Sequence, residues 1–213
     1  MNKVVEKVTA FITRNKKEKN ELLLFIHPNA GIQIPAGTVE KGETVKEALM
    51  REVTEETGLK KISIRNYIGF KDRKLPKNQF FISEKTKVYS RPTSNSFDWA
   101  ELRKGITVTS NRTLDDYTQI TFREYDRYPD QNYITYQITG WILTTNLSKK
   151  MRRHFFHIVI NEEAQDEWEI FADNHLFRVF WSPFMNLPDI IAPHRHWLKY
   201  VQYELKYSFD DLA

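Results

Sequence analysis

Three carboxylates with helical spacing are the residues of this chain most suited to chemistry. Glu52, Glu55 and Glu56 stand at positions i, i+3 and i+4, so on a helix they share one face. Like charges at this spacing repel by about 0.2–0.5 kcal/mol per pair, which favours a compensating cation. Mg²⁺ prefers oxygen ligands and commonly joins carboxylates to substrate phosphates. The triple alone is typical of a solvated acidic helix face. Together with a glycine-containing loop at the other end of the helix, it also has the parts needed for a divalent-metal site and diphosphate chemistry.

An amphipathic helix must position these carboxylates. Residues 43–57 are strong helix formers, and the apolar residues among them recur at spacings of three and four: Val45, Ala48, Leu49 and Val53. Gly58 stands where a helix C-cap is expected, and a loop containing Gly37 and Gly42 precedes the helix. We therefore predict a loop followed by one helix over residues 43–57.

Residues 37–59 resemble the Nudix box, whose pattern is Gly, five residues, Glu, seven residues, Arg-Glu, an aliphatic, one residue, Glu-Glu, one residue, Gly and an aliphatic. Every specified place is filled, by Gly37, Glu43, Arg51, Glu52, Val53, Glu55, Glu56, Gly58 and Leu59. The match is specific but spans only about a tenth of the chain. The resemblance implies an α+β fold, the Nudix α/β/α sandwich with a mixed β-sheet.

The resemblance also implies roles for single residues. Glu52, Glu55 and Glu56 would bind Mg²⁺ or Mn²⁺, with the backbone carbonyl of Ala36 as a further ligand. Arg51 would pair with Glu43 and hold the helix to its loop, so Glu52, Arg51 and Glu43 form the expected catalytic group. The general base would be Glu52 or an acidic residue on a downstream loop, where the candidates are Glu162, Glu163, Asp166 and Glu167.

The implied reaction is hydrolysis of a phosphoanhydride bond in a nucleoside diphosphate linked to another moiety, assisted by divalent metals that lower the pKa of water. The box does not identify the substrate. The residues that we expect to contact it are His27, Gln33, Gly37 and Glu163. The alternative is a catalytically silent Nudix-fold module for ligand sensing or protein interaction. Processing of RNA 5′ ends is a third hypothesis, which the scattered positive charge does not favour.

Strand-like segments flank the box on both sides. Those before and directly after it are residues 3–13, 22–26, 32–34 and 62–70, and those near the end are 133–143, 154–160 and 167–181, followed by a helix over 194–206. We predict a Nudix domain made of residues 1–70 and 131–213, with resemblance to its sheet resuming at Tyr136–Trp141.

Residues 71–130 form the predicted insertion, which is mainly β or irregular and much longer than ordinary connections. It contains many aromatic residues, including Phe80, Phe81, Tyr89, Phe97, Trp99, Tyr117 and Tyr125. These side chains could stack on a nucleobase, so one hypothesis is a part of the substrate pocket or a dimer contact. The alternative is that they form the insertion's own small core.

Composition excludes several classes of function. The 213 residues include no cysteine, which removes disulfides, thiolate zinc sites and cysteine nucleophiles. The net charge of +4 comes from scattered lysines and arginines, so we do not expect a nucleic-acid partner. The histidine pairs do not predict a zinc site without further ligands. We found neither a signal peptide nor an apolar run long enough to span a membrane, and therefore expect a cytoplasmic protein with a small-molecule, nucleotide-type substrate.

Overall fold

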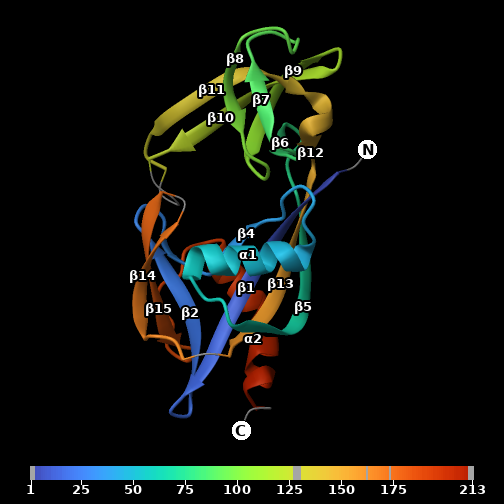
Figure 1. Ribbon diagram of the computed structural model, residues 1–213. Helices are drawn as coiled ribbons and strands as arrows, with labels where there is room; N and C mark the ends of the chain where they lie inside the picture. Colours follow the sequence, from blue (N-terminus) through green and yellow to red (C-terminus); the bar gives the residue numbers. More distant parts are fainter. Residues whose placement is uncertain (1–2, 127–130, 162, 173, 211–213) are drawn as a thin grey trace. The chain divides into compact units, whose positions relative to one another are not determined.

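The strands around the acidic helix belong to one sheet of the structure, a computed structural model that describes residues 3–126, 131–161, 163–172 and 174–210. Within these residues the sheet has eight strands (Figure 1): β1 (Val4–Lys16), β2 (Lys19–His27), β3 (Gly31–Gln33), β4 (Ala36–Thr38), β5 (Ile62–Lys74), β13 (Lys150–Ile160), β14 (Glu167–Ala172) and β15 (His175–Pro183). The strand order is β14-β15-β2-β1-β13-β5, with β3 beside β2 and β4 beside β1.

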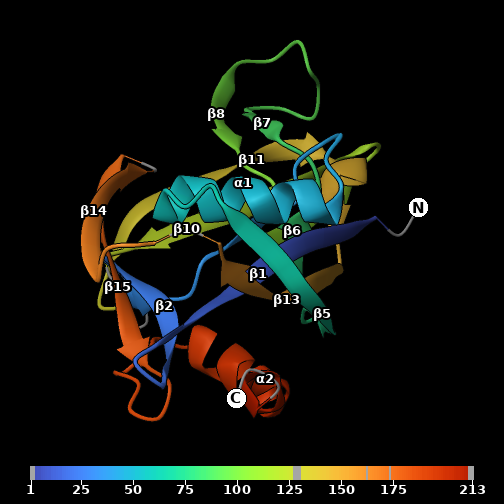
Figure 2. The ribbon, with the colours of Figure 1, turned by 60° about the horizontal axis from the view of Figure 1, so that its bottom comes forward.

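Helices cover the sheet on both faces. Figure 2 shows α1 (Val45–Thr57) on one side of β1 and β13 and α2 (His194–Asp210) on the other. In β1 every side chain from Val8 to Thr13 is buried, as expected for a strand with both faces covered. On the α2 side, Phe11 and Phe155 of the sheet pack in one cluster with Leu198, Val201 and Leu205 of the helix. The predicted fold class, a mixed sheet between helices with additional β structure, is confirmed.

A second sheet follows β5 along the chain. Its seven strands, counted over the described residues, are β6 (Gln79–Ile82), β7 (Thr86–Tyr89), β8 (Asp98–Leu102), β9 (Thr107–Leu114), β10 (Tyr117–Tyr125), β11 (Ile134–Leu143) and β12 (Leu147–Ser148), with the short 3₁₀ helix η1 (Thr144–Asn146) before β12. The order is β12-β6-β9-β10-β11-β7-β8. Buried side chains such as Ile82, Val88, Ile120 and Ile142 form a core that belongs to this sheet alone.

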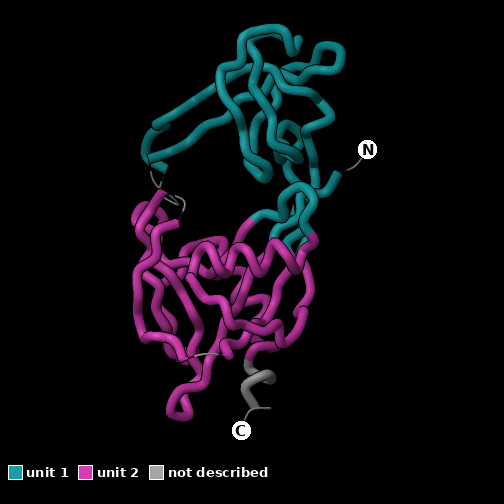
Figure 3. The backbone as a smooth tube through the Cα atoms, viewed as in Figure 1, with its two compact units in different colours: residues 1–7, 38–43, 71–153 teal, residues 8–37, 44–70, 154–213 magenta. Residues whose placement is uncertain are grey.

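The chain divides into two compact units, which Figure 3 shows in different colours. One consists of residues 8–37, 44–70 and 154–213, and the other of residues 1–7, 38–43 and 71–153. The insertion was predicted to end at residue 130, whereas the second unit continues to Arg153. The expectation that Tyr136–Trp141 returns to the Nudix sheet is wrong, because these residues lie in β11 and pair with β10. An alternating strand pattern is the same in either sheet, so it could not decide between them.

Among the described residues, no helix combines the length and the apolar character needed to cross a membrane.

Candidate active site

Both ends of α1 are defined by the residues that flank it. Thr44 is the N-cap: its side chain accepts a hydrogen bond from the Glu47 N–H, and the Glu47 carboxylate accepts one from the Thr44 N–H. Gly58 ends the helix at a φ of 76°, and its N–H donates to the Thr54 carbonyl. The helix buries Ala48, Leu49 and Val53. The predicted helix is therefore present, and it begins two residues after the predicted start.

Glu52 lies against the backbone of Gly37. Its side chain is only 14% exposed. A Cβ atom built on Gly37 would lie 1.8 Å from both Cδ and Oε1 of Glu52, so only glycine leaves room for this carboxylate. Gly37 thus has a specific physical role, which is to let a charged group approach the main chain closely.

The other two glutamates of the triple also have defined partners. Arg51 lies between two carboxylates, with Nη1 at 2.9 Å from both Glu52 Oε1 and Glu55 Oε2. Glu56 Oε2 accepts a hydrogen bond of 2.8 Å from the Ala36 N–H. Ala36 and Gly37, the first two residues of β4, therefore contact Glu56 and Glu52 respectively. One charged helix face and one short strand form this cluster.

The donor set of the cluster suits a hard divalent cation, because it consists of carboxylate oxygens with the backbone of Ala36 nearby. In the described part of the chain, no three histidine or acidic side chains are already arranged to hold a metal ion. The charge of Arg51 instead compensates Glu52 and Glu55. Binding a metal through these two carboxylates would require them to exchange the guanidinium for the ion.

Glu43 lies in the loop before the helix and accepts a hydrogen bond of 2.8 Å from the Glu40 N–H. The contact helps to close the turn of residues 40–43, which directly precedes the N-cap Thr44. The predicted pairing of Glu43 with Arg51, and the metal ligand role of the Ala36 carbonyl, stay predictions.

The downstream acidic candidates differ in their surroundings. Asp166 contacts Lys16 and Arg14, whose hydrogen bonds and charge lower the pKa of its carboxyl group. Glu167 is held by Arg178, which lowers the pKa of that carboxyl group in the same way. A lowered pKa makes a carboxylate a weaker base.

Glu163 instead lines a pocket of about 630 Å³ together with Thr57, Gly58 and Leu59 at the C-terminal end of α1. Glu162 lies outside the described residues. Of the predicted downstream candidates that the structure describes, only Glu163 lines this pocket at the end of the acidic helix. A second acidic residue, Glu169, which was not predicted from the sequence, lines the pocket as well.

The two candidates before the box lie in β2 and β3. The His27 ring contacts those of His175 and Phe177, at centroid distances of 4.7 and 5.2 Å, and its Nδ1 accepts a hydrogen bond from the Asn29 N–H. Gln33 is paired with Phe25 in the register of β2 and β3. Their contact with a substrate stays a prediction.

Other histidines make structural hydrogen bonds. His157 is fully buried, and its Nε2 shares a hydrogen bond of 2.7 Å with Thr13 Oγ1. Burial, with a smaller contribution from Arg65, lowers the pKa of His157 to about 4. His194 Nδ1 accepts a hydrogen bond from the Ile34 N–H.

Arg14 was not singled out from the sequence. Its side chain is 8% exposed and forms ion pairs with Glu21 and Asp166. The sequence shows only that an arginine follows the strongly apolar part of a strand. An arginine at an exposed position gives the same pattern, so the sequence did not indicate a buried ion-paired side chain.

Comparisons with known proteins agree with the box. Residues 5–98 match the sequence model of the NUDIX domain. A stretch of 53 residues is 45% identical to the Caenorhabditis elegans protein "Putative nudix hydrolase 1", covering 23% of this chain and 14% of that relative. The chain therefore spans only a small part of the curated relative that it matches.

Two solved structures show a more distant similarity. The NUDIX domain of Shewanella oneidensis NrtR, in a cocrystal structure with ADP ribose, aligns over 96% of this chain and 90% of that chain with 10% identity and a TM-score of 0.47. The E. coli dihydroneopterin triphosphate pyrophosphohydrolase aligns over 84% and 81% with 14% identity and a TM-score of 0.35. The complete box and the match of residues 5–98 to the NUDIX domain support membership of the Nudix superfamily.

Proposed function

We propose that this chain is a divalent-metal-dependent pyrophosphohydrolase, which cleaves a phosphoanhydride bond in a nucleoside diphosphate linked to another moiety. The observation that carries the proposal is the Glu52 carboxylate held against Gly37, beside Arg51 and Glu55. Keeping a charged group in a largely buried position beside another carboxylate costs stability, and a role in chemistry explains why it is kept there.

Glu52, Glu55 and Glu56 would hold Mg²⁺ or Mn²⁺, with the Ala36 carbonyl as a further ligand. A divalent ion bound there would lower the pKa of water and neutralise charge on phosphoryl oxygens. Arg51 compensates the charges of Glu52 and Glu55. Glu163 or Glu52 would accept the proton of the attacking water, and Glu43 would hold Arg51 and the loop to the helix.

The second unit, which contains residues 71–130, is proposed to contribute to the substrate pocket or to a dimer contact. Its aromatic residues divide into two groups. Phe81 is buried, in agreement with a core role. Phe97 and Trp99 are 68% and 55% exposed and meet edge to face at a centroid distance of 5.2 Å, so they are available to a ligand or a partner.

The test is phosphate release with Mg²⁺ and Mn²⁺ over a panel of nucleoside triphosphates, ADP-ribose, nucleotide sugars, dinucleoside polyphosphates and coenzyme A. Nucleotide products are separated by ion-exchange chromatography, because some cleavages release no free phosphate. Glu55→Gln is the test variant, since it removes a carboxylate that is 55% exposed and should disturb the fold little. Asp189→Asn is the matched control, because it removes an exposed carboxylate that pairs with Arg195 of α2, outside both α1 and residues 71–130.

We expect at least one substrate to be hydrolysed, with most of that activity lost in Glu55→Gln and unchanged activity in Asp189→Asn. Activity of Glu55→Gln within a few-fold of the unaltered chain would show that the metal assignment is wrong. A folded chain that binds a nucleotide of the panel but hydrolyses none would instead identify a ligand-sensing module.

A further inference from the structure

Arg14, whose side chain is 8% exposed, is the centre of an ion-pair cluster on the unit that carries α1. It lies in β1, and its Nε donates a hydrogen bond of 2.7 Å to the carboxylate of Glu21, its partner across the β1–β2 hairpin. The guanidinium also stacks over the ring of Trp181, 4.4 Å from the centroid. The side chain is thus fixed by a carboxylate at one edge and by an aromatic face.

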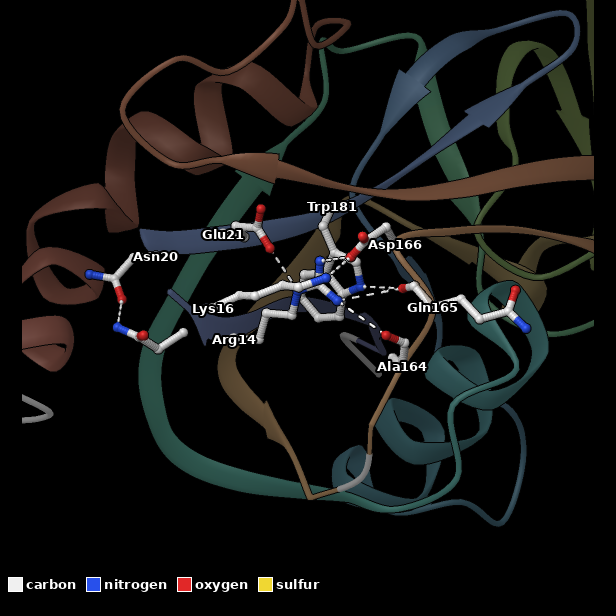
Figure 4. Close-up of polar contacts among 9 residues, drawn as sticks. Arg14, Lys16, Asn20, Glu21, Ala164, Gln165, Asp166 and Trp181 are labelled. Atoms are coloured by element: carbon white, nitrogen blue, oxygen red, sulfur yellow. Dashed lines mark hydrogen bonds and ion pairs between the residues drawn. The ribbon is translucent and has the colours of Figure 1, made fainter. Parts of the chain in front are cut away.

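The remaining donors of Arg14 hold the segment before β14, as Figure 4 shows. Nη1 donates to the carbonyl oxygens of Ala164 and Gln165, at 3.3 and 3.5 Å, and Nη2 donates to Asp166 Oδ1 at 2.6 Å. One side chain therefore contacts three consecutive residues. Because the five N–H groups of arginine project in a planar fork, a lysine at this position could not make the same contacts.

Trp181 reinforces the same segment. Its indole Nε1 donates to the Gln165 carbonyl at 3.1 Å, and its backbone N–H donates to the Asp166 carbonyl. Two residues further on, Trp168 Nε1 donates to the Thr57 carbonyl at the end of α1, at 2.7 Å. The segment is held by Arg14 and Trp181 at residues 164–166 and by the helix at Trp168.

Glu163 directly precedes this anchored segment. It lines the pocket of about 630 Å³ that also includes Thr57 and Gly58, the residues that follow Glu56 in the chain. The position of Glu163 relative to the acidic helix therefore depends on contacts made by residues 164–168. Arg14 contacts all three of residues 164–166, whereas Trp181 contacts Gln165 and Asp166, and Lys16 contacts Asp166.

We propose that Arg14 is a positioning residue for catalysis, which fixes residues 164–166 so that Glu163 reaches the reacting groups beside the end of α1. The inference rests on the proposed hydrolase function and extends it to a residue outside the Nudix box. Arg14 itself does not contact the substrate, and its effect on turnover passes through Glu163.

The experiment is a double-mutant cycle of Arg14→Lys and Glu163→Gln, with kcat and KM measured on the best substrate of the panel. Arg178→Lys is the matched control. Arg178 also forms a two-donor ion pair with an acidic residue of the same region, Glu167, but that pair is exposed and lies within the β14–β15 hairpin. Hydrogen–deuterium exchange over residues 163–166 reports the anchoring without any need for turnover.

We expect Arg14→Lys to lower kcat about 10- to 100-fold, because misplacing a reacting group by about 1 Å can cost 100-fold, while KM changes less. In the Glu163→Gln background the same substitution should change kcat by less than about threefold. Exchange over residues 163–166 should accelerate in Arg14→Lys and stay unchanged in Arg178→Lys, because the Arg178 partner Glu167 lies outside that range.

Equal effects of Arg14→Lys in both backgrounds, or unchanged exchange over residues 163–166, would overturn the inference while leaving the hydrolase intact. Retained activity in Glu55→Gln would count against the proposed metal site and not against Arg14. A chain that hydrolyses nothing on the panel would overturn both the function and this inference.

Discussion

Replacing Gly37 with alanine separates a catalytic role of Glu52 from a structural one. The new Cβ would lie 1.8 Å from Cδ and Oε1 of Glu52 and 2.2 Å from Oε2. Real Cβ contacts essentially never fall below 3.0 Å, so the carboxylate must move by more than about 1 Å. The group that moves is the far end of a flexible side chain, so the backbone of β4 has no need to move.

The expected loss of activity follows from that displacement. A shift of about 1 Å in a catalytic group can lower the rate about 100-fold, which corresponds to about 2.7 kcal/mol of transition-state stabilisation. The free energy of unfolding should change much less, by about 1 kcal/mol or below, because Glu52 can adopt another rotamer. Gly37→Ala should therefore lose activity and metal affinity without losing its fold.

Gly42→Ala is the control, because its effects should be the reverse. Gly42 has a φ of 90° and nothing within 4 Å of its Cβ position, so alanine meets strain without a clash. We expect about 1–2 kcal/mol of destabilisation and activity within a few-fold of the unaltered chain. The assays are urea unfolding, Mn²⁺ titration by isothermal calorimetry and kcat on the panel substrate.

Two results would refute the reasoning about Gly37. Unchanged kcat and Mn²⁺ affinity in Gly37→Ala would show that the position of Glu52 does not matter for the chemistry. Destabilisation of several kcal/mol would show that the close approach of Glu52 to Gly37 serves packing.

Two further predictions concern stability. The pKa of His157 is about 4 in the folded chain and 6.5 when unperturbed, so the unfolded chain binds the proton first as the pH falls. The free energy of unfolding should therefore decrease as the pH is lowered from 6.5 to 4, by about 3 kcal/mol at most. Urea unfolding of His157→Gln should not show this decrease, and an equal pH dependence in both chains would contradict the prediction. Thr44→Ala removes the side-chain half of the capping box and should cost about 1 kcal/mol of unfolding free energy, whereas an unchanged thermal midpoint would show that the cap contributes nothing.

The local structure around the box could be predicted from the sequence, because it depends on contacts between residues that are close together in the chain. Helix-forming residues with apolar spacing specify α1, and Thr44, Glu47 and Gly58 cap it through contacts within a few residues. The spacing of Glu52, Glu55 and Glu56 likewise requires only a helix to bring the carboxylates together.

Contacts between distant parts of the chain were decided only by the tertiary structure. The strand pattern of residues 134–143 fits either sheet, and only the pairing of β11 with β10 assigns it to the second one. Arg14 and Asp166 are 152 residues apart, so no local pattern joins them. The sequence by itself determined the acidic helix and the family resemblance of the chain, because the spacing of a periodic motif specifies which residues share a helix face. The fold alone decided that Glu163 lies near the end of that helix, because long-range packing positions the segment that carries it.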